Sequence, residues 1–175
     1  MRIKNLAVLT IALAAAIVSS CAAPPSEKQN INLKGSDTML QLGQRWAEVF
    51  MKDHPGAVIQ VTGGGSGTGI AALINGTTQI CQSSRPMKDE EKASVKQQRN
   101  ADVGEIPVAV DALSVYLNKQ NALEHLTMEQ VRRIFQGEIT NWKDVGGTNG
   151  TILLYGRENS SGSYAFFKEH VLANG

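Results

Sequence analysis

The chain has 175 residues, a formal net charge of +1, three histidines and two cysteines. This near-neutral balance excludes the broad basic surface typical of proteins that bind nucleic acid, so no nucleic-acid partner is expected. Histidine and cysteine never occur together at the short spacing of a metal site, and we expect neither a metal nor a cofactor.

The first 21 residues have the pattern of a bacterial export signal. Two basic residues precede an apolar run over residues 6–18, and the segment ends in Val18-Ser19-Ser20-Cys21. The run is short for a membrane-spanning helix, whereas its basic start and small-residue end indicate a secretory signal over residues 1–20. The last four residues resemble a lipobox, which implies that Cys21 is lipidated and that the protein is anchored in the cell envelope, facing the periplasm or the exterior. An uncleaved N-terminal anchor is the alternative.

Residues 21–30 include Pro24 and Pro25, show no apolar periodicity and are expected to form a flexible tether. With Cys21 assigned to lipidation, Cys81 has no partner for an intramolecular disulfide. We therefore expect Cys81 to be a small buried strand residue, and the fold to be stabilised by packing alone.

From residue 31 onward, strand-like and helix-like patterns alternate. Short apolar runs predict strands, and apolar residues at helical spacing predict helices. In chain order we expect a strand over 31–33, a helix over 39–50, a strand over 58–61, a helix over 70–73, a strand over 78–81, a charged and solvated helix over 88–100, two strands over 105–117 broken near Asp111, a helix over 126–136, a strand over 152–155 and a helix from Ser161. This alternation predicts an α/β fold with a mostly parallel sheet and helices on both faces.

Three turns rich in serine and threonine each follow a predicted strand and open a predicted helix. They are Gly35-Ser36-Asp37-Thr38, Gly65-Ser66-Gly67-Thr68-Gly69 and Arg157-Glu158-Asn159-Ser160-Ser161-Gly162-Ser163. A helix N-terminus carries unpaired N–H groups and partial positive charge, and neighbouring hydroxyls add donors. Ligands of parallel sheets bind beyond the carboxyl ends of the strands, where all three turns fall. The sequence therefore predicts a site for a small oxyanion.

These turns also fit other interpretations. Each turn alone could be a helix cap without a ligand. The run Gly67-Thr68-Gly69-Ile70-Ala71-Ala72 fits a dinucleotide fingerprint, but the acidic residue at the expected distance, Asp89, lies at the start of a charged helix instead of a strand tip. A nucleophile elbow is excluded because Thr68 stands where its last glycine is required.

Five ordered motifs carry a family resemblance from about residue 31 to the end of the chain. They are Gly35-Ser36-Asp37-Thr38, the glycine run from Gly63 to Gly69, Ser83-Ser84-Arg85-Pro86-Met87, the stretch from Ile134 to Trp142, and the run from Gly156 to Ser163. In this order they resemble the substrate-binding proteins of phosphate-specific ABC importers. The resemblance implies a two-lobed clamshell of periplasmic-binding-protein type II, with lobe one over 31–110 and a partial lobe two over 111–175. It also implies a monomer that is not an enzyme, captures inorganic phosphate and delivers it to an ABC permease.

The resemblance also implies which residues contact phosphate. Lobe one would contribute Thr38, the Met39 backbone, Ser66 and Ser84, and lobe two would contribute Arg157, Ser161, Gly162 and Ser163. The chemistry agrees, because a desolvated phosphate needs several donors and one guanidinium grips two oxygens at once.

The sequence departs from this family in two respects. One branch carries carboxylates at the positions of Ser84 and Asn159, where they accept a hydrogen bond from the proton on phosphate. Asp37, Glu158 and Asn159 are the candidates for this acceptor role here. The chain is also shorter than such clamshells, so we expect it to be C-terminally incomplete, with unpaired strand edges and exposed apolar surface. An exported phosphate-handling enzyme and a surface adhesin or signalling lipoprotein of the same fold remain alternatives.

Overall fold

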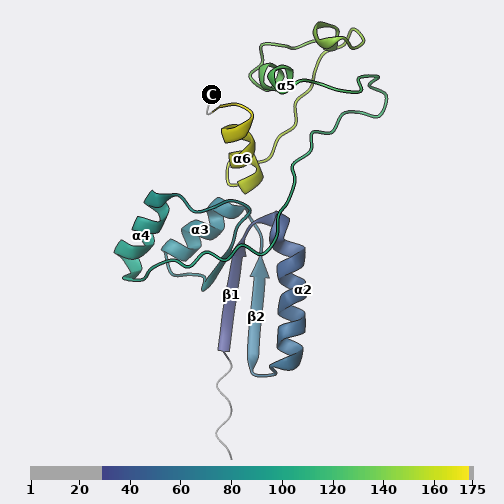
Figure 1. Cartoon of the computed structure of the whole chain (residues 1–175). Coiled ribbons are helices and arrows are strands. Elements are labelled where there is room, and N and C mark those ends of the chain that lie inside the picture. The colour runs from purple at the N-terminus through teal and green to yellow at the C-terminus, as the bar shows by residue number, and fades with distance from the viewer. Residues whose placement is uncertain (1–28, 174–175) are drawn as a thin grey trace, which may run out of the picture.

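The computed structural model describes residues 29–173 (Figure 1). The predicted signal, Cys21 and all but the end of the predicted tether lie outside the described residues. The elements in chain order are β1 (Gln29–Gly35), α2 (Asp37–Asp53), β2 (Ala57–Thr62), α3 (Ser66–Ile74), β3 (Ile80–Gln82), α4 (Asp89–Arg99), α5 (Met128–Phe135), the 3-10 helix η2 (Trp142–Val145) and α6 (Gly162–His170). Across this described part, none of the helices has the length and apolar character needed to cross a bilayer.

The strands form a parallel sheet in the order β2-β1-β3, with β1 in the centre. Ile31 pairs with Ile59 of β2, and Lys34 pairs with Cys81 of β3. Parallel neighbours need a crossover connection, and α2 and α3 provide the two crossovers. The parallel α/β arrangement is therefore confirmed.

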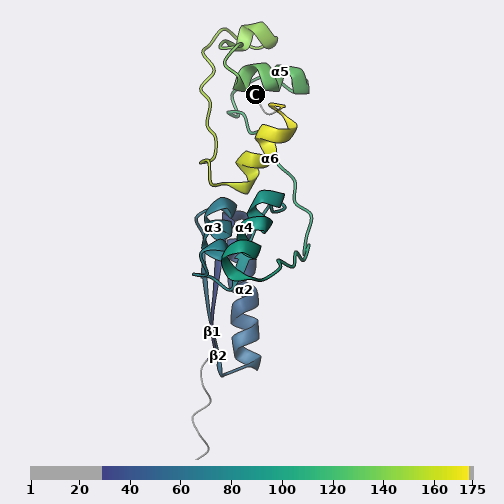
Figure 2. The same ribbon diagram turned by 90° about the vertical axis from the view of Figure 1, so that its left-hand side faces the viewer.

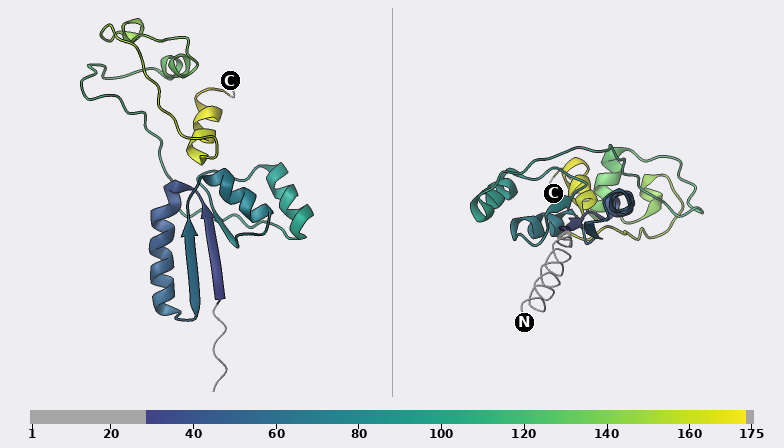
Figure 3. Two further views of the ribbon diagram at one scale, coloured as in Figure 1. Left: turned by 180° about the vertical axis from the view of Figure 1, so that it is seen from behind. Right: turned by 90° about the horizontal axis from the view of Figure 1, so that it is seen from below.

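Two close approaches show that α2 and α3 cover opposite faces of this sheet. A Cβ at Gly43 of α2 would meet the side chain of Gln82, and a Cβ at Gly69 of α3 would lie 2.9 Å from the Sγ of Cys81. Adjacent residues of a strand point to opposite faces, so the helices that contact Cys81 and Gln82 lie on different sides. Figures 1 and 3 likewise show α2 on one side of the strands and α3 with α4 on the other.

Apolar residues are buried in two separate clusters. The first is centred on Ile70, Met87 and Val95, and the half-buried Cys81 packs against it. Burial raises the pKa of the Cys81 thiol to about 11, so this cysteine stays protonated and unreactive at neutral pH. Cys81 thus fits its expected role as a small residue packed within the sheet.

The second cluster is centred on Ile134, Ile139 and Val145 and joins α5 to η2. Phe135 of α5 meets Phe167 of α6, with ring centroids 4.7 Å apart. Figures 1 and 2 both show α6 between α5 and α3. The last helix therefore links the second cluster to the sheet-bearing part of the chain.

The strands predicted over 105–117 and 152–155 do not form, and this part of the prediction was wrong. Residues 101–118 are extended without regular structure, and Ile106 and Tyr116 are 83% and 90% exposed. Next to the second run, Thr151 makes an isolated antiparallel bridge with Asn141. An apolar run becomes a strand only where a neighbour pairs with its N–H and C=O groups. Among the described residues, such pairing is limited to the start of the second run, where Ile152 N–H donates to the Thr140 carbonyl at 2.9 Å.

Candidate anion-binding site

The three serine-bearing turns meet beyond the carboxyl ends of β1 and β2. Gly64 N–H donates to Asp37 Oδ1 at 2.9 Å, which joins the first turn to the glycine turn. Arg157 Nη2 donates to Asp37 Oδ2 at 3.1 Å, and Gly67 N–H donates to the Ser160 carbonyl at 2.9 Å. The third turn therefore contacts both of the others.

Ser66, Ser84 and Gly162 pack directly against one another. Ser66 begins α3 and is fully buried, and its Oγ accepts from Ser84 N–H at 3.1 Å. The two hydroxyl oxygens lie 3.2 Å apart. A Cβ at Gly162, the first residue of α6, would strike both hydroxyls. The start of α6 is thus seated on two serine hydroxyls of the sheet-bearing part.

A side-chain capping hydrogen bond is present in one of the three turns. Ser161 is buried, and its Oγ accepts from Tyr164 N–H at 3.3 Å, as the N-cap of α6. The caps of α2 and α3, Ser36 and Gly65, make no side-chain cap bond. A capping hydroxyl uses its oxygen as the acceptor, so the Ser161 proton is still available to an anion.

Four of the predicted contact residues line a single cavity of about 1040 Å³: Thr38, Met39, Ser84 and Ser163. Thr38, Met39 and Ser163 stand in first helical turns, where backbone N–H groups have no carbonyl partner within the helix. The cavity is much larger than a tetrahedral anion because the extended segment 101–113 forms part of its wall. The other predicted contacts in these turns, Ser66, Ser161 and Gly162, are buried next to it.

Arg157 lies at the exposed side of this arrangement. Its Nη2 donates to Asp37 and, at 3.4 Å, to Glu158 Oε1, and its side chain is 45% exposed. Its Nη1 and Nε have no hydrogen-bond partner within residues 29–173. Of the candidate proton acceptors, Asp37 uses both oxygens and Glu158 contacts Arg157, whereas Asn159 is exposed and its side chain makes no hydrogen bond in the described part.

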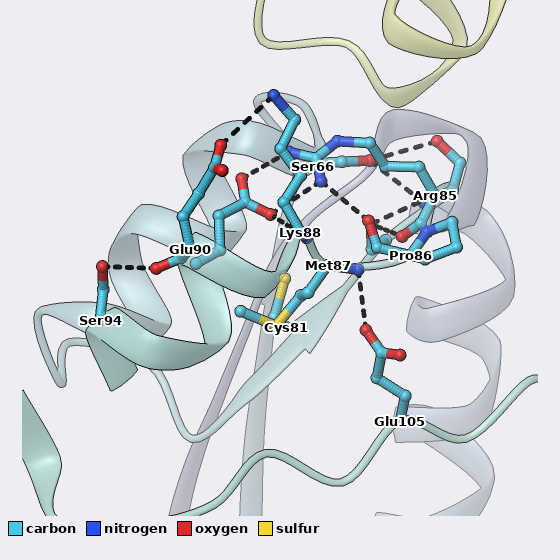
Figure 4. Close-up of polar contacts among 12 residues, drawn as sticks. Ser66, Cys81, Arg85, Pro86, Met87, Lys88, Glu90, Ser94 and Glu105 are labelled. Carbon is cyan, nitrogen blue, oxygen red and sulfur yellow. Dashed lines mark hydrogen bonds and ion pairs between the residues drawn. The ribbon is translucent and has the colours of Figure 1, made fainter. Parts of the chain in front are cut away.

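A buried ion pair supports the loop that carries Ser84 (Figure 4). Arg85 Nη1 and Nη2 donate to the two carboxylate oxygens of Glu91 at 2.9 and 2.8 Å, and Nη1 also donates to the Pro86 carbonyl at 2.8 Å. Both side chains are mostly buried, with 15% and 19% exposure. Glu91 also accepts from Lys88 N–H at 2.8 Å and so caps α4. The helix over 88–100 was predicted to be charged and solvated, and the mostly buried side chain of Glu91 departs from that prediction.

The same loop is held from its other end by Glu105 (Figure 4). Met87 N–H donates to Glu105 Oε1 at 2.7 Å. Lys92 Nζ lies 3.3 Å from Glu105 Oε2. The Met87 hydrogen bond lowers the pKa of Glu105, and the Lys92 contact adds to the effect. The loop around Ser84 is therefore tied to α4 and to the extended segment.

Replacing Glu91 with glutamine should destabilise this loop in a pH-dependent manner. The Arg85 hydrogen bond holds the pKa of Glu91 below its ordinary value. A carboxyl whose pKa falls on folding stabilises the protein above the unfolded pKa, and that contribution is lost as pH falls through the folded pKa. We expect Glu91→Gln to lower the free energy of unfolding by about 1–2 kcal/mol at neutral pH, and by progressively less below about pH 4.

Urea unfolding of both forms across this pH range checks that expectation. Asp53→Asn, at the exposed end of α2, is a suitable control because it removes one acid without touching the loop. A deficit of Glu91→Gln that stays constant into acid would contradict the role of the ion pair.

Comparison with known proteins identifies the family. The chain matches the PBP superfamily domain over residues 21–175. It belongs to the PBP superfamily. Its relatives include the phosphate-binding protein PstS of Pseudomonas aeruginosa, 36% identical over 158 residues with 83% of this chain and 49% of the relative covered, and that of Bacillus subtilis, 33% identical over 185 residues with 97% and 60% covered. The resemblance inferred from the five motifs is confirmed.

Solved structures agree with these relatives. A Clostridium perfringens substrate-binding protein assigned to phosphate ABC transport, with phosphate bound, matches at a TM-score of 0.73 and 31% identity. The match covers 82% of this chain and 56% of that one. An ABC-type phosphate transport receptor from Vibrio cholerae matches at 0.64 and 31% identity, with 80% and 54% covered. The PBP-type α/β fold is thus confirmed, and the chain spans about half the length of the curated relatives it matches first.

Three contacts in and around the candidate site were not foreseen from the sequence. They are the Asp37 bridge to Arg157, the Ser160 carbonyl beneath Gly67 and the Arg85–Glu91 pair. The first two join parts of the chain far apart in sequence, and no local pattern marks them. The sequence did contain a weak signal for the Arg85–Glu91 pair. The two residues carry opposite charges, stand six positions apart and lie on either side of Pro86, which precedes α4.

Proposed function

We propose that this chain captures inorganic phosphate for an ABC importer. The observation that carries the proposal is the meeting of three helix starts with one arginine at the carboxyl ends of a parallel sheet. Helix starts supply N–H donors and partial positive charge, and Arg157 supplies the full charge. The names of the relatives support phosphate as the anion.

The proposed contacts divide between two lobes, 31–110 and 111–175. In lobe one, Thr38, the Met39 backbone, Ser66 and Ser84 donate to phosphate; in lobe two, Arg157, Ser161, Gly162 and Ser163 do so. The hydroxyls and backbone N–H groups bind without adding charge, so binding stays reversible, as delivery to a permease requires. The contact of Gly162 with Ser66 and Ser84 brings the two lobes together beside the cavity that Thr38, Met39 and Ser163 line, which supports a clamshell that closes next to the anion.

Isothermal calorimetry with inorganic phosphate, on the chain without its first 20 residues, tests the proposal. A ligand that binds only the folded state stabilises it by about 2.7 kcal/mol at a hundredfold excess over Kd, so phosphate should also raise the melting temperature. Binding of a nucleotide or sugar instead of phosphate would contradict the proposal. Turnover of a phosphate ester would favour the exported enzyme, and absence of any phosphate effect would favour the adhesin or signalling lipoprotein.

We also propose that the protein is an exported monomer anchored by lipid at Cys21. The support is the basic start, the apolar run and Val18-Ser19-Ser20-Cys21. Anchoring keeps the receptor near its permease in the membrane, so captured phosphate is delivered over a short distance. The names of the solved relatives, which refer to phosphate ABC transport, support a permease as the partner.

Cys21→Ser should abolish lipid labelling and release the protein from the membrane fraction, because a thioether-linked lipid cannot form on a hydroxyl. Metabolic labelling with a fatty acid, followed by membrane fractionation, measures both effects. Cys81→Ser is the matched control and should leave labelling intact. Unchanged membrane association of Cys21→Ser would indicate an uncleaved N-terminal helix instead.

A further inference from the structure

Asp37 occupies the point where the three turns meet. It is the first residue of α2, and its two carboxylate oxygens have different partners. Oδ1 accepts from Gly64 N–H at 2.9 Å, and Oδ2 accepts from Arg157 Nη2 at 3.1 Å, across 120 residues of sequence. The start of a helix also favours a negative charge, so the carboxylate is stabilised where it stands.

The glycine turn fixes this carboxylate in place. A Cβ at Gly63 would strike Asp37 Oδ1, so the turn wraps closely around that oxygen. Gly64 has a φ of +108°, a conformation that glycine adopts without strain, and this directs its N–H at the same oxygen. Asp37 therefore offers Arg157 a rigid partner.

Arg157 has little else to position it. The segment before it is extended and exposed, with Leu153 and Tyr155 at 73% and 86%. Its other partner, Glu158, is its chain neighbour and lies farther away, at 3.4 Å. Within the described residues, the contact with Asp37 is the only one that ties the guanidinium to the sheet-bearing part of the chain.

We propose that Asp37 is a positioning residue that holds Arg157 over the glycine turn, and that it does not accept a hydrogen bond from the proton of the ligand. This inference rests on the proposed function. Asp37 accepts a hydrogen bond from Nη2 of Arg157 alone, so Nη1 and Nε of Arg157 can donate to the anion. Asp37 acts through Arg157, so its removal weakens every anion that Arg157 grips, whatever the protonation state of that anion.

Asp37→Asn is the sharpest test, because the amide keeps an acceptor for Gly64 and removes the charge facing Arg157. We expect phosphate affinity, measured by calorimetry, to fall about tenfold, which is the effect of one charged hydrogen bond. The factor should be equal at about pH 5.5 and about pH 8.5, on either side of the second ionisation of a phosphate group. Asp53→Asn, the same substitution at the far end of α2, should change affinity less than twofold.

A double-mutant cycle shows whether Asp37 acts through Arg157. In an Arg157→Gln background, Asp37→Asn should change phosphate affinity less than twofold, since its partner is already gone. An undiminished tenfold loss there would overturn the inference, because Asp37 would then act independently of Arg157. A loss confined to the lower pH would also overturn it, because the carboxylate would then be the proton acceptor.

Hydrogen exchange of the Gly67 amide tests the same contact without ligand. Gly67 N–H donates to the Ser160 carbonyl, so its exchange reports how firmly the Arg157 segment is seated on the glycine turn. Asp37→Asn and Arg157→Gln should each speed this exchange several-fold, and the double variant no further. If wild-type protein binds no phosphate, the proposed function fails while this measurement still decides the role of Asp37. Unchanged exchange in Asp37→Asn would overturn the inference.

Discussion

Arg157→Ala is expected to weaken phosphate binding by about a hundredfold or more, whereas Ser84→Ala should weaken it about fivefold. Arg157 would supply the only full positive charge among the proposed contacts, and it can grip two oxygens at once. Ser84 would supply one neutral hydrogen bond, and its hydroxyl already shares a hydrogen bond with Ser66 at 3.2 Å. Calorimetry of both variants at one pH and one salt concentration gives the comparison.

Arg157→Lys serves as the matched variant for this pair. Lysine keeps the charge but lacks the planar fork, so it should recover only part of the affinity lost in Arg157→Ala. Lysine would also lose the directional contact of Nη2 with Asp37. Equal losses from Arg157→Ala and Ser84→Ala would mean that Arg157 lies outside the site and that the third turn is wrongly assigned.

The helices were predictable because their signals are local. Glycine and serine before an apolar periodic run placed the starts of α3 and α6 at Ser66 and Gly162 to within a few residues. The three strands of the sheet were predictable for a similar reason, since each is a short apolar run followed by a turn. In contrast, residues 105–117 carry the same kind of apolar run and form no strand, because a strand depends on a neighbour whose distance along the chain is not fixed by the local sequence.

The candidate site shows the same division between local and distant contacts. Hydroxyl-bearing residues at helix starts were visible in the sequence, and so was Arg157 beside one of them. The contact of Asp37 with Arg157 was not, because 120 residues separate the two. The seating of Gly162 on Ser66 and Ser84 was equally hidden, because nothing in a glycine indicates which side chains approach it. Composition and spacing thus predicted which residues stand in the three turns but not the contacts that arrange them.

The need for glycine at position 162 gives the second large expected effect. Gly162→Ala should lower the free energy of unfolding by about 2–3 kcal/mol, as overpacking does, and phosphate affinity at least tenfold. The added Cβ would strike the Ser66 and Ser84 hydroxyls and lie 3.2 Å from the Ser66 Cβ. Ser66 cannot move aside easily, because it is fully buried at the start of α3 and its Oγ accepts from Ser84 N–H.

The helix propensity of alanine offsets part of the stability that Gly162→Ala loses to the clash. Alanine favours a helix interior over glycine by about 0.5–1 kcal/mol, so without a clash Gly162→Ala would stabilise the protein slightly. Gly156→Ala, outside the helix, controls for the added methyl group alone, because a Cβ there meets nothing within 4 Å, and its effect should stay within about 0.5 kcal/mol. Urea unfolding and phosphate calorimetry measure both variants. If Gly162→Ala were as stable as Gly156→Ala and bound phosphate normally, α6 would not be seated on Ser66 and Ser84, and the proposed closure over the anion would have to be abandoned.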